Sequence, residues 1–290
     1  MRRCRWWRAG RRRRTPRGGA DGGSGGEPAD RLGLDRPSAA RMYDYHLGGS
    51  HNFAVDRQMA EQAIAAMPDL PLVLRANRSL LRRAVQFLAA AGVDQFLDLG
   101  SGIPTVGNVH EIAQRVNPRA RVVYVDVDPV AVAHSQRLLA DNDRAGVVQC
   151  DLRHVDAVLH AATVTQGLDL GRPVAVLLVA VLHFLPDADR LADIVRGYWT
   201  ALASGSYVVI SHASHDARSP VGQGHAQALC RHTATPLTMR SHAEVAALVD
   251  GLEPVPPGLV RLPLWRPDGP EALPGPADAF PGWTVVARRP

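Results

Sequence analysis

The residues with the clearest chemical potential stand together at positions 98–102, in the order Asp98-Leu99-Gly100-Ser101-Gly102. The apolar run before them predicts a buried strand over residues 95–99, and a helix is predicted after them over residues 106–116. In an open parallel sheet, ligands bind at the carboxyl ends of the strands, and glycine lets the backbone approach a ligand closely. The segment therefore predicts a ligand-binding loop.

The glycine spacing and the acid before it discriminate between nucleotide ligands. A dinucleotide fingerprint has a third glycine three residues after the second, and Pro104-Thr105 stands in that stretch instead. A fixed negative charge at Asp98 is poorly suited to a pyrophosphate. It suits a ligand that carries an ammonium and a sulfonium group, as S-adenosylmethionine does.

Two further carboxylates end the next two predicted strands. Asp126 closes the strand 121–126, where a carboxylate can accept hydrogen bonds from both hydroxyls of a ribose. Asp151 follows the strand 147–150 and can accept a hydrogen bond from an adenine amino group. A helix cap or a loop acid explains any one of the three as well as a site does. Together, at three successive strand ends, they indicate a site for a nucleoside that carries a sulfonium.

The elements that must position these groups alternate between strand and helix. Strands are predicted at 95–99, 121–126, 147–150, 174–179 and 207–211, and helices at 106–116, 129–140, 154–160, 189–203 and 241–249. This alternation is typical of an α/β fold with parallel strands, right-handed crossovers and helices on both faces of the sheet. The apolar stretches 259–265 and 283–287 predict an antiparallel, hairpin-like pair at the sheet edge.

Three helices are predicted before this α/β region, at 38–47, 53–67 and 71–91, and we expect them to form a lid over the carboxyl ends of the strands. Aromatic and polar side chains surround the glycine pair at 48–49, which suits a mobile substrate lid. We take Tyr43, Tyr45 and Asn52 as its candidate substrate residues. The alternative is that the aromatic residues simply anchor the helix to the core.

The net charge of +5 comes from the first residues of the chain. Nine arginines precede the first acidic residue, Asp21, so the rest of the chain is mildly acidic and has no overall signature of nucleic-acid binding. Residues 1–30 are rich in Arg and Gly without apolar periodicity, and we expect them to be disordered. No apolar run is long enough to span a membrane. Three widely spaced cysteines favour a reducing, cytoplasmic location and predict no metal site.

The loop 98–102 together with Asp126 and Asp151 resembles that of class I S-adenosylmethionine-dependent methyltransferases. Five stretches resemble one actinobacterial branch of uncharacterised proteins, first grouped as a domain of unknown function and now called an S-adenosyl methyltransferase family. They are residues 37–49, 51–57, 75–78, 107–111 and 179–184. The resemblance extends from about residue 37 to the end of the chain.

This resemblance implies a Rossmann-like, mostly parallel sheet of seven strands in the order 3-2-1-4-5-7-6, with strand 7 antiparallel. It implies S-adenosylmethionine as the cofactor, its methionine part near Asp98, Gly100 and Gly102, its ribose at Asp126 and its adenine along 151–152. The expected cofactor-binding residues are Arg75, Asp98, Gly100, Ser101, Gly102, Asp126, Val127, Asp151, Leu152 and Ala180. Pro104 departs from the more flexible glycine of many methyltransferases.

Two candidate residues lie outside the cofactor loop. Arg75, with Arg78 and Arg82, falls on one helical face and can bind the carboxylate of the cofactor through two hydrogen bonds. A solvated helix face explains the same spacing. His183 follows the fourth strand, where it can take a proton from a hydroxyl or amine nucleophile, and it is the candidate catalytic residue. A hydrogen-bonded structural histidine is the alternative.

These observations predict three segments: a tail at 1–30, a helical lid at 31–92 and a cofactor-binding methyltransferase domain at 93–290. The predicted function is methyl transfer from S-adenosylmethionine to an unidentified small molecule. The main alternative is a regulator that binds the cofactor without turnover. An oxidoreductase is disfavoured by Asp98 and the missing glycine. A nucleic-acid methyltransferase is disfavoured because Ala180-Val181-Leu182-His183 stands where its Asn/Asp-Pro-Pro-Tyr signature is expected.

Overall fold

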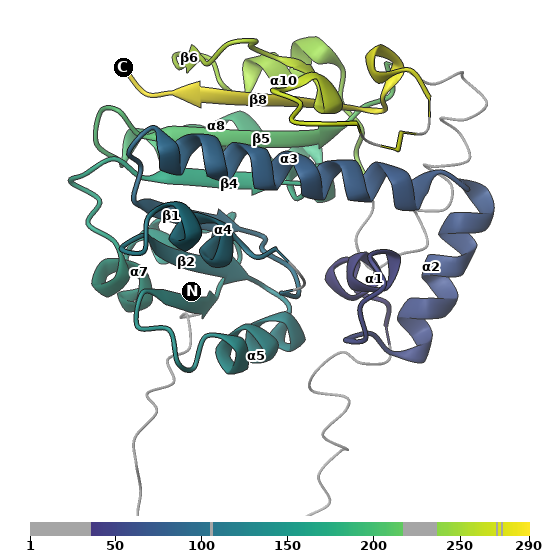
Figure 1. The fold of residues 1–290 in the computed structure, drawn as a ribbon, viewed down its shortest axis with the longest axis horizontal. Coiled ribbons are helices and arrows are strands. Elements are labelled where there is room, and N and C mark those ends of the chain that lie inside the picture. Colours follow the sequence, from purple (N-terminus) through teal and green to yellow (C-terminus); the bar gives the residue numbers. More distant parts are fainter. Residues whose placement is uncertain (1–35, 105–106, 217–236, 271, 274) are drawn as a thin grey trace, which may run out of the picture.

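The computed structural model describes residues 36–104, 107–216, 237–270, 272–273 and 275–290. The predicted disorder of residues 1–30 and the predicted helix start at residue 106 lie outside the described residues. The described chain forms one mixed sheet with helices on both faces (Figure 1).

The strands run in the order β3-β2-β1-β4-β5-β8-β6, and β7 also pairs with β8. Strands β1 to β5 are parallel to one another, and β8 is antiparallel to β5. Their bounds are β1 Gln95–Leu99, β2 Arg121–Asp126, β3 Ala145–Gln149, β4 Ala175–Val179, β5 Tyr207–Ala213, β6 Glu253–Pro254, β7 Val260–Arg261 and β8 Gly282–Arg288. The predicted order is confirmed, with β8 in the place of the expected seventh strand.

The last part of the sheet differs in detail from the prediction. The stretch 259–265 contributes only the two-residue strand β7 before turning into the 3₁₀ segment η3 (Leu262–Leu264), and β8 lies between β5 and β6 instead of in an edge hairpin. Proline cannot donate to a strand ladder, and Pro254, Pro256, Pro257 and Pro263 punctuate this segment. Pairing with β8 is therefore divided between two short strands, which makes eight strands where seven are predicted.

The helices begin close to their capping signals. They are α1 Ala39–His46, α2 Ala54–Ala66, α3 Leu70–Ala90, α4 Val109–Val116, α5 Pro129–Leu138, α6 Val155–Leu159, α7 Ala162–Gly167, α8 Leu191–Thr200 and α10 His242–Ala247. The Asp128 carboxylate caps α5 by accepting from the backbone N–H of Val130 at 2.7 Å, and Pro129 opens that helix. Helix α7 is not predicted from the sequence, because its six residues are too few to carry a helical period.

Alternate residues of the central strands enter two separate cores. On β1, Leu97 and Leu99 face a core with residues of α6, α7, α8 and α10, while Phe96 faces a second core with α3 and α4. This two-sided burial explains why the strands are nearly continuous apolar runs. Helix α3 runs along the second face (Figure 1), so the third predicted lid helix is part of the core layer.

The remaining two predicted lid helices, α1 and α2, lie beyond the end of the sheet in Figure 1. A buried ion pair holds them together, with Arg41 Nε 2.8 Å from Asp56 Oδ2, and both side chains are almost fully buried. The second carboxylate oxygen of Asp56 accepts from the backbone N–H of Ser38 at 2.9 Å. The Ser38 hydroxyl donates to Asp128, which ties the start of α1 to the loop after β2.

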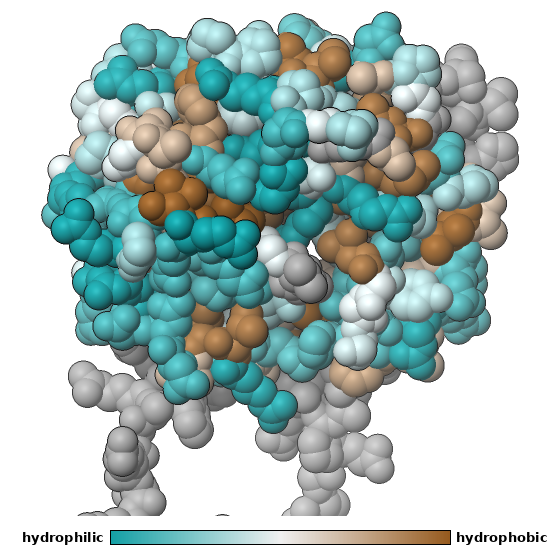
Figure 2. Space-filling model, in the orientation of Figure 1, coloured by the Kyte–Doolittle hydropathy of each residue, from teal (hydrophilic) through white to brown (hydrophobic). Residues whose placement is uncertain are grey.

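The face of the molecule shown in Figure 2 is mostly hydrophilic, with hydrophobic residues in small separate patches. Among the described helices, none combines the length and the apolar character that crossing a bilayer requires.

We expect the substitution Asp56→Ala to lower the free energy of unfolding by about 3–5 kcal/mol, because it leaves the buried Arg41 guanidinium with only its more distant ion-pair partner, Asp128 at 3.8 Å. Urea denaturation measures this change. Arg82→Ala is the control, since it breaks the exposed pair with Asp268 and is expected to cost about 0–1 kcal/mol. Equal costs for the two variants would contradict an anchoring role for the buried pair.

Candidate functional site

Two adjoining cavities lie between α1 and the carboxyl ends of the parallel strands. The larger has a volume of about 650 Å³ and is lined by the loops after β1, β2, β3 and β4. The smaller, about 190 Å³, lies between α1, α2, α3 and the end of β5. Both are lined by Ala39, Tyr43, Asn77, Ala180 and Phe184. The two cavities are therefore neighbours with a common boundary.

The loop after β1 requires glycine at two positions. Gly100 and Gly102 have φ values of +72° and +67°, which L side chains rarely adopt. A Cβ at position 100 would lie 2.2 Å from Cγ2 of Val181, so the loop packs directly on the segment after β4. The backbone N–H of Gly102 donates to Asp126 Oδ2 at 2.7 Å. These constraints fix the loop at the edge of the larger cavity.

Asp126 joins the ends of β1 and β2. Its other oxygen, Oδ1, accepts from the backbone N–H of Asp128 at 2.8 Å. Burial raises the pKa of Asp126, and the backbone hydrogen bonds from Asp128 and Gly102 counteract part of that rise. Each carboxylate oxygen retains a lone pair, so the group can accept further hydrogen bonds from a ligand.

Asp98 is a buried acid in an unfavourable environment for a negative charge. Burial raises its pKa to about 7; the positive charge of Arg78 opposes this rise, and the neighbouring carboxylate of Asp126 adds to it. The phenol of Tyr124, whose pKa burial also raises, lies close enough to interact with Asp98. A cation brought into this cavity would favour ionised Asp98.

The acid at the end of β3, Asp151, has a lowered pKa, unlike Asp98 and Asp126. Asp151 pairs with the guanidinium of Arg153, with Nε 3.0 Å from Oδ1. Burial raises the pKa of Asp151, but hydrogen bonds from Arg153 outweigh that effect and lower it. Beside it, Leu152 is buried and Val127 is 63% exposed, which leaves an apolar surface at the cavity wall.

Nine of the ten residues predicted to bind the cofactor line the larger cavity: Asp98, Gly100, Ser101, Gly102, Asp126, Val127, Asp151, Leu152 and Ala180. The tenth, Arg75, is exposed and lines neither cavity. Arg78, three residues later on α3, lines the cavity instead. The helical spacing identified the face of α3 but not which turn reaches the cavity.

Of the three predicted lid residues, one lines the cavities and two do not. Tyr43 lines both cavities, whereas Tyr45 and Asn52 line neither. The Tyr45 hydroxyl donates to exposed Glu61 at 3.1 Å, since two residues along a helix reverse the direction of a side chain. The Asn52 amide donates to Asp44 Oδ2 at 2.9 Å and holds the loop between α1 and α2. The structure therefore brings only Tyr43, of the three predicted substrate residues, to the cavities.

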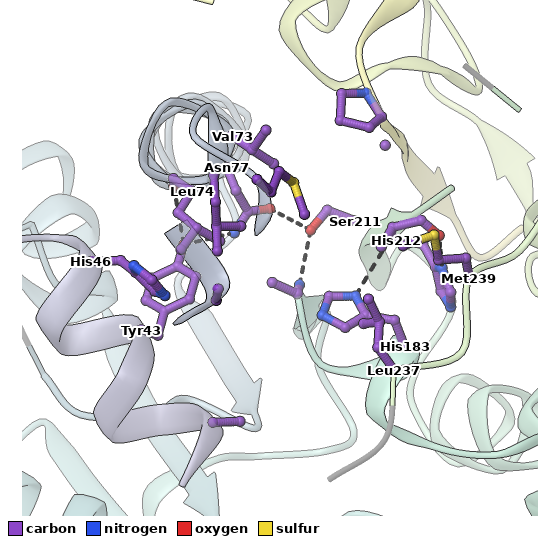
Figure 3. A pocket seen from close by; sticks show the side chains of 18 of the residues that line it. Tyr43, His46, Val73, Leu74, Asn77, His183, Ser211, His212, Leu237 and Met239 are labelled. Carbon is purple, nitrogen blue, oxygen red and sulfur yellow. Dashed lines mark hydrogen bonds between the residues drawn. The ribbon is translucent and has the colours of Figure 1, made fainter. Parts of the chain in front are cut away.

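A chain of hydrogen bonds crosses the boundary between the cavities (Figure 3). The backbone N–H of Ala180 donates to Ser211 Oγ at 2.9 Å, and Ser211 Oγ donates to Asn77 Oδ1 at 2.6 Å. The Asn77 amide then donates to the Tyr43 hydroxyl at 3.1 Å, and that hydroxyl donates to the carbonyl of Leu74 at 3.2 Å. Ala180 has a φ of +55°, a strained value for a residue with a Cβ, which is common at functional sites.

His183, the candidate catalytic residue, lines the smaller cavity. Its Nδ1 accepts from the backbone N–H of Ala213 at 3.4 Å, so the neutral ring carries its proton on Nε2. Burial, then the neighbouring His212 and Arg240, lower the pKa of His183 well below its usual value. A ring in this state is a hydrogen-bond donor at neutral pH and holds an extra proton poorly.

Asn77 and Ser211 are absent from the predicted site, although Asn77 lies on the boundary and Ser211, its hydrogen-bond partner, lines the smaller cavity. They are 134 residues apart and come from α3 and β5. Asn77 lies within the stretch 75–78 that resembles the family, but that stretch gave it no role, and Ser211 belongs to no such stretch. The signal available in the sequence was that Asn77 is a polar residue on the apolar face of an otherwise amphipathic helix.

The strand order, the glycine loop after β1 and the acids at the ends of β1, β2 and β3 together define a class I methyltransferase fold. A profile of the S-adenosyl methyltransferase family matches residues 25–290, and the chain belongs to this family. The chain is therefore a methyltransferase whose cofactor is S-adenosylmethionine. A search among curated proteins finds no significant match.

Two solved structures are similar over nearly their whole length. One is a protein from Thermobifida fusca YX, provisionally classed as a methyltransferase, with 38% identity and a TM-score of 0.84 over 90% of this chain and 98% of that one. The other is a DUF574 family protein from Streptomyces avermitilis MA-4680, with 38% identity and a TM-score of 0.85 over 90% of this chain and all of that one.

The raised pKa of Asp98 has a measurable consequence for stability. A carboxyl that ionises less readily in the folded chain stabilises it at low pH, and this contribution is lost as the pH rises from about 4 to the folded value of about 7. Relative to Asp98→Asn, we expect the free energy of unfolding of the parent chain to fall by about 1.4 kcal/mol per pH unit across this window. Urea denaturation at several pH values measures the difference; parallel pH profiles would contradict the assignment.

Proposed function

We propose that this methyltransferase transfers the methyl group of S-adenosylmethionine to a small molecule bound in the smaller cavity. The observation that carries the proposal is the common boundary of the two cavities at Tyr43, Asn77 and Ala180. A donor in one cavity and an acceptor in the other would meet there. The 190 Å³ volume supports a small acceptor over a macromolecular surface.

Several features of the larger cavity fit the cofactor. Its volume of about 650 Å³ lies within the range of small-molecule sites. The Ser101 hydroxyl is buried there without a hydrogen-bond partner, which is costly unless a ligand supplies one. Asp98 provides a negative charge that a cation would stabilise, and the glycine loop lets the backbone come close to a ligand.

We assign the cofactor contacts from these features. Asp98 would face the positively charged part of the cofactor, and Asp126 would accept hydrogen bonds from its ribose hydroxyls. Val127 and Leu152 would pack on the adenine, with Asp151 at its amino group. We assign its carboxylate to Arg78 in place of Arg75, because Arg78 alone of the two lines the cavity.

When bound, the cofactor supplies an activated methyl group attached to a positively charged sulfur. The chain's own contribution is to align the acceptor and exclude water, which accounts for much of the catalysis of such displacements. Tyr43 and Asn77 are held by hydrogen bonds in fixed orientations at the boundary. His183 would donate a hydrogen bond from Nε2 and orient the acceptor; its lowered pKa argues against use as a general base.

We also propose different roles for the helices that precede the sheet. Helices α1 and α2 would act as the lid, and α3 would belong to the cofactor-binding domain because it shares a core with the sheet. We also propose a cytoplasmic location, on the ground that the three cysteines are far apart and form no recognisable disulfide framework.

The arginines of α3 provide a matched pair for testing the cofactor contacts. We expect Arg78→Met to weaken S-adenosylmethionine binding by about tenfold to a hundredfold, the range expected for losing a charge-assisted hydrogen bond. Arg75→Met should leave the dissociation constant unchanged, because Arg75 lies outside the cavity. Calorimetry measures both. The reverse pattern would favour Arg75.

The function itself is tested by incubating the full chain with radiolabelled S-adenosylmethionine and a small-molecule extract of the organism that encodes it. We expect label in an extractable product of low molecular mass, and none with the variant Asp126→Ala. Binding of the cofactor without any transfer would favour the regulatory alternative. Label recovered in protein or nucleic acid would contradict a small-molecule acceptor.

A further inference from the structure

The smaller cavity has a composition that restricts what it can bind. Most of its wall is aliphatic, aromatic or thioether, with residues such as Met42, Leu74, Phe184, Met239 and Phe280. Figure 3 shows the wall closing around a central space, with Tyr43 and His46 on one side and His183 and Met239 on the other. Such a wall favours an apolar ligand.

The described wall contains no Asp, Glu, Lys or Arg residue. Its three histidines are neutral at pH 7, because burial lowers the pKa of His46 and His212 to about 4 and that of His183 well below its usual value. Arg240 lies behind the wall, where its Nη1 is 2.9 Å from His212 Nε2, and its charge is balanced by Asp187. A charged ligand would lose its hydration here without gaining a counter-charge.

The size of the cavity sets a second limit. A cavity of about 150 Å³ lined by apolar side chains is known to hold one benzene molecule. The volume here, about 190 Å³, exceeds this by the space of one or two small substituents. It therefore suits a single six-membered ring with one or two small substituents.

One edge of the cavity is polar, and the hydrogen bonds within the chain determine which of its donors and acceptors are free for a ligand. The hydroxyl hydrogens of Ser211 and Tyr43 are used within the chain of hydrogen bonds, while one N–H of Asn77 and a lone pair of Tyr43 remain available. The Nε2 proton of His183 is a second donor on the wall. A ligand hydroxyl matches this edge, since it can donate to Tyr43 and accept from Asn77. A carboxylate cannot donate at all.

We propose that the smaller cavity binds a neutral, hydroxylated single-ring compound of the phenol class, with its hydroxyl at the edge formed by Asn77 and Tyr43. These two residues also line the larger cavity, so the hydroxyl oxygen faces the cofactor site. The catalytic meaning of this inference rests on the proposed function, whereas the binding itself does not.

The test measures binding to the full chain without cofactor, by ligand-detected NMR titration with four probes: phenol, benzoate, benzylamine and 2-naphthol. We expect saturable phenol binding and at least tenfold weaker binding of the two charged probes and of the bicyclic one. Binding of benzoate or benzylamine as tight as that of phenol would overturn the neutral character. Equal binding of 2-naphthol would overturn the size limit.

Two variants of neighbouring residues on α3 locate the binding. Val73 lines the smaller cavity and Leu72 lines neither. Val73→Phe should reduce phenol affinity at least fivefold by filling the space, and Leu72→Phe should leave it unchanged, each with a melting temperature recorded to verify folding. Equal phenol affinity in both variants would overturn the assignment to this cavity.

Asn77→Ala tests the polar edge. It should weaken phenol binding at least fivefold and leave benzene binding unchanged, because benzene has no hydroxyl to lose its partner. Equal losses for the two ligands would overturn the placement of the hydroxyl. If phenol binds as expected but the radiolabel assay yields no product from any small molecule, the proposed function fails while the ligand class of this cavity stands.

Discussion

The buried ion pair between Arg41 and Asp56 is the interaction on which the site depends. It joins α1 to α2, and the bonds of Ser38 to Asp56 and Asp128 extend the connection to the end of β2. Helix α1 supplies residues to both cavities, so the walls of both depend on its position. A buried ion pair is a weak source of stability by itself, because its desolvation offsets its attraction. Here its role is to fix the position of α1 relative to α2 and the end of β2.

The electrostatics of the larger cavity follow from the same closure. Packing around the carboxyl ends of the strands removes water from Asp98, and the loss of hydration raises its pKa to about 7. The chain thus holds an acid that is poorly stabilised until a positive charge arrives. The smaller cavity has the opposite character, because its histidines are kept neutral and its wall lacks charged side chains among the described residues. One scaffold therefore holds a site suited to a cation beside a site suited to a neutral molecule.

Local patterns predicted the alternation of strands and helices and the cofactor loop, whereas the order of the strands in the sheet came from the family resemblance. Asp98, Asp126 and Asp151 are recognisable because each directly follows an apolar strand, and the ends of parallel strands meet at one edge. Helical spacing placed Arg75 and Arg78 on one face of α3 but did not show which turn reaches the cavity, and residue type did not show where the loop that carries Asn52 folds back. The pairing of Asn77 with Ser211 depends on how α3 lies across the sheet, which no local pattern contains. Strand β6 was not predicted, because its two residues are too few to form an alternating pattern.

The position of α1 has a consequence for solvent. Ala39 and Tyr43 belong to the walls of both cavities, so a displacement of this helix exposes the two compartments together. Water cannot enter one through this helix and leave the other dry. The access of water to the two compartments is therefore coupled through a single eight-residue helix.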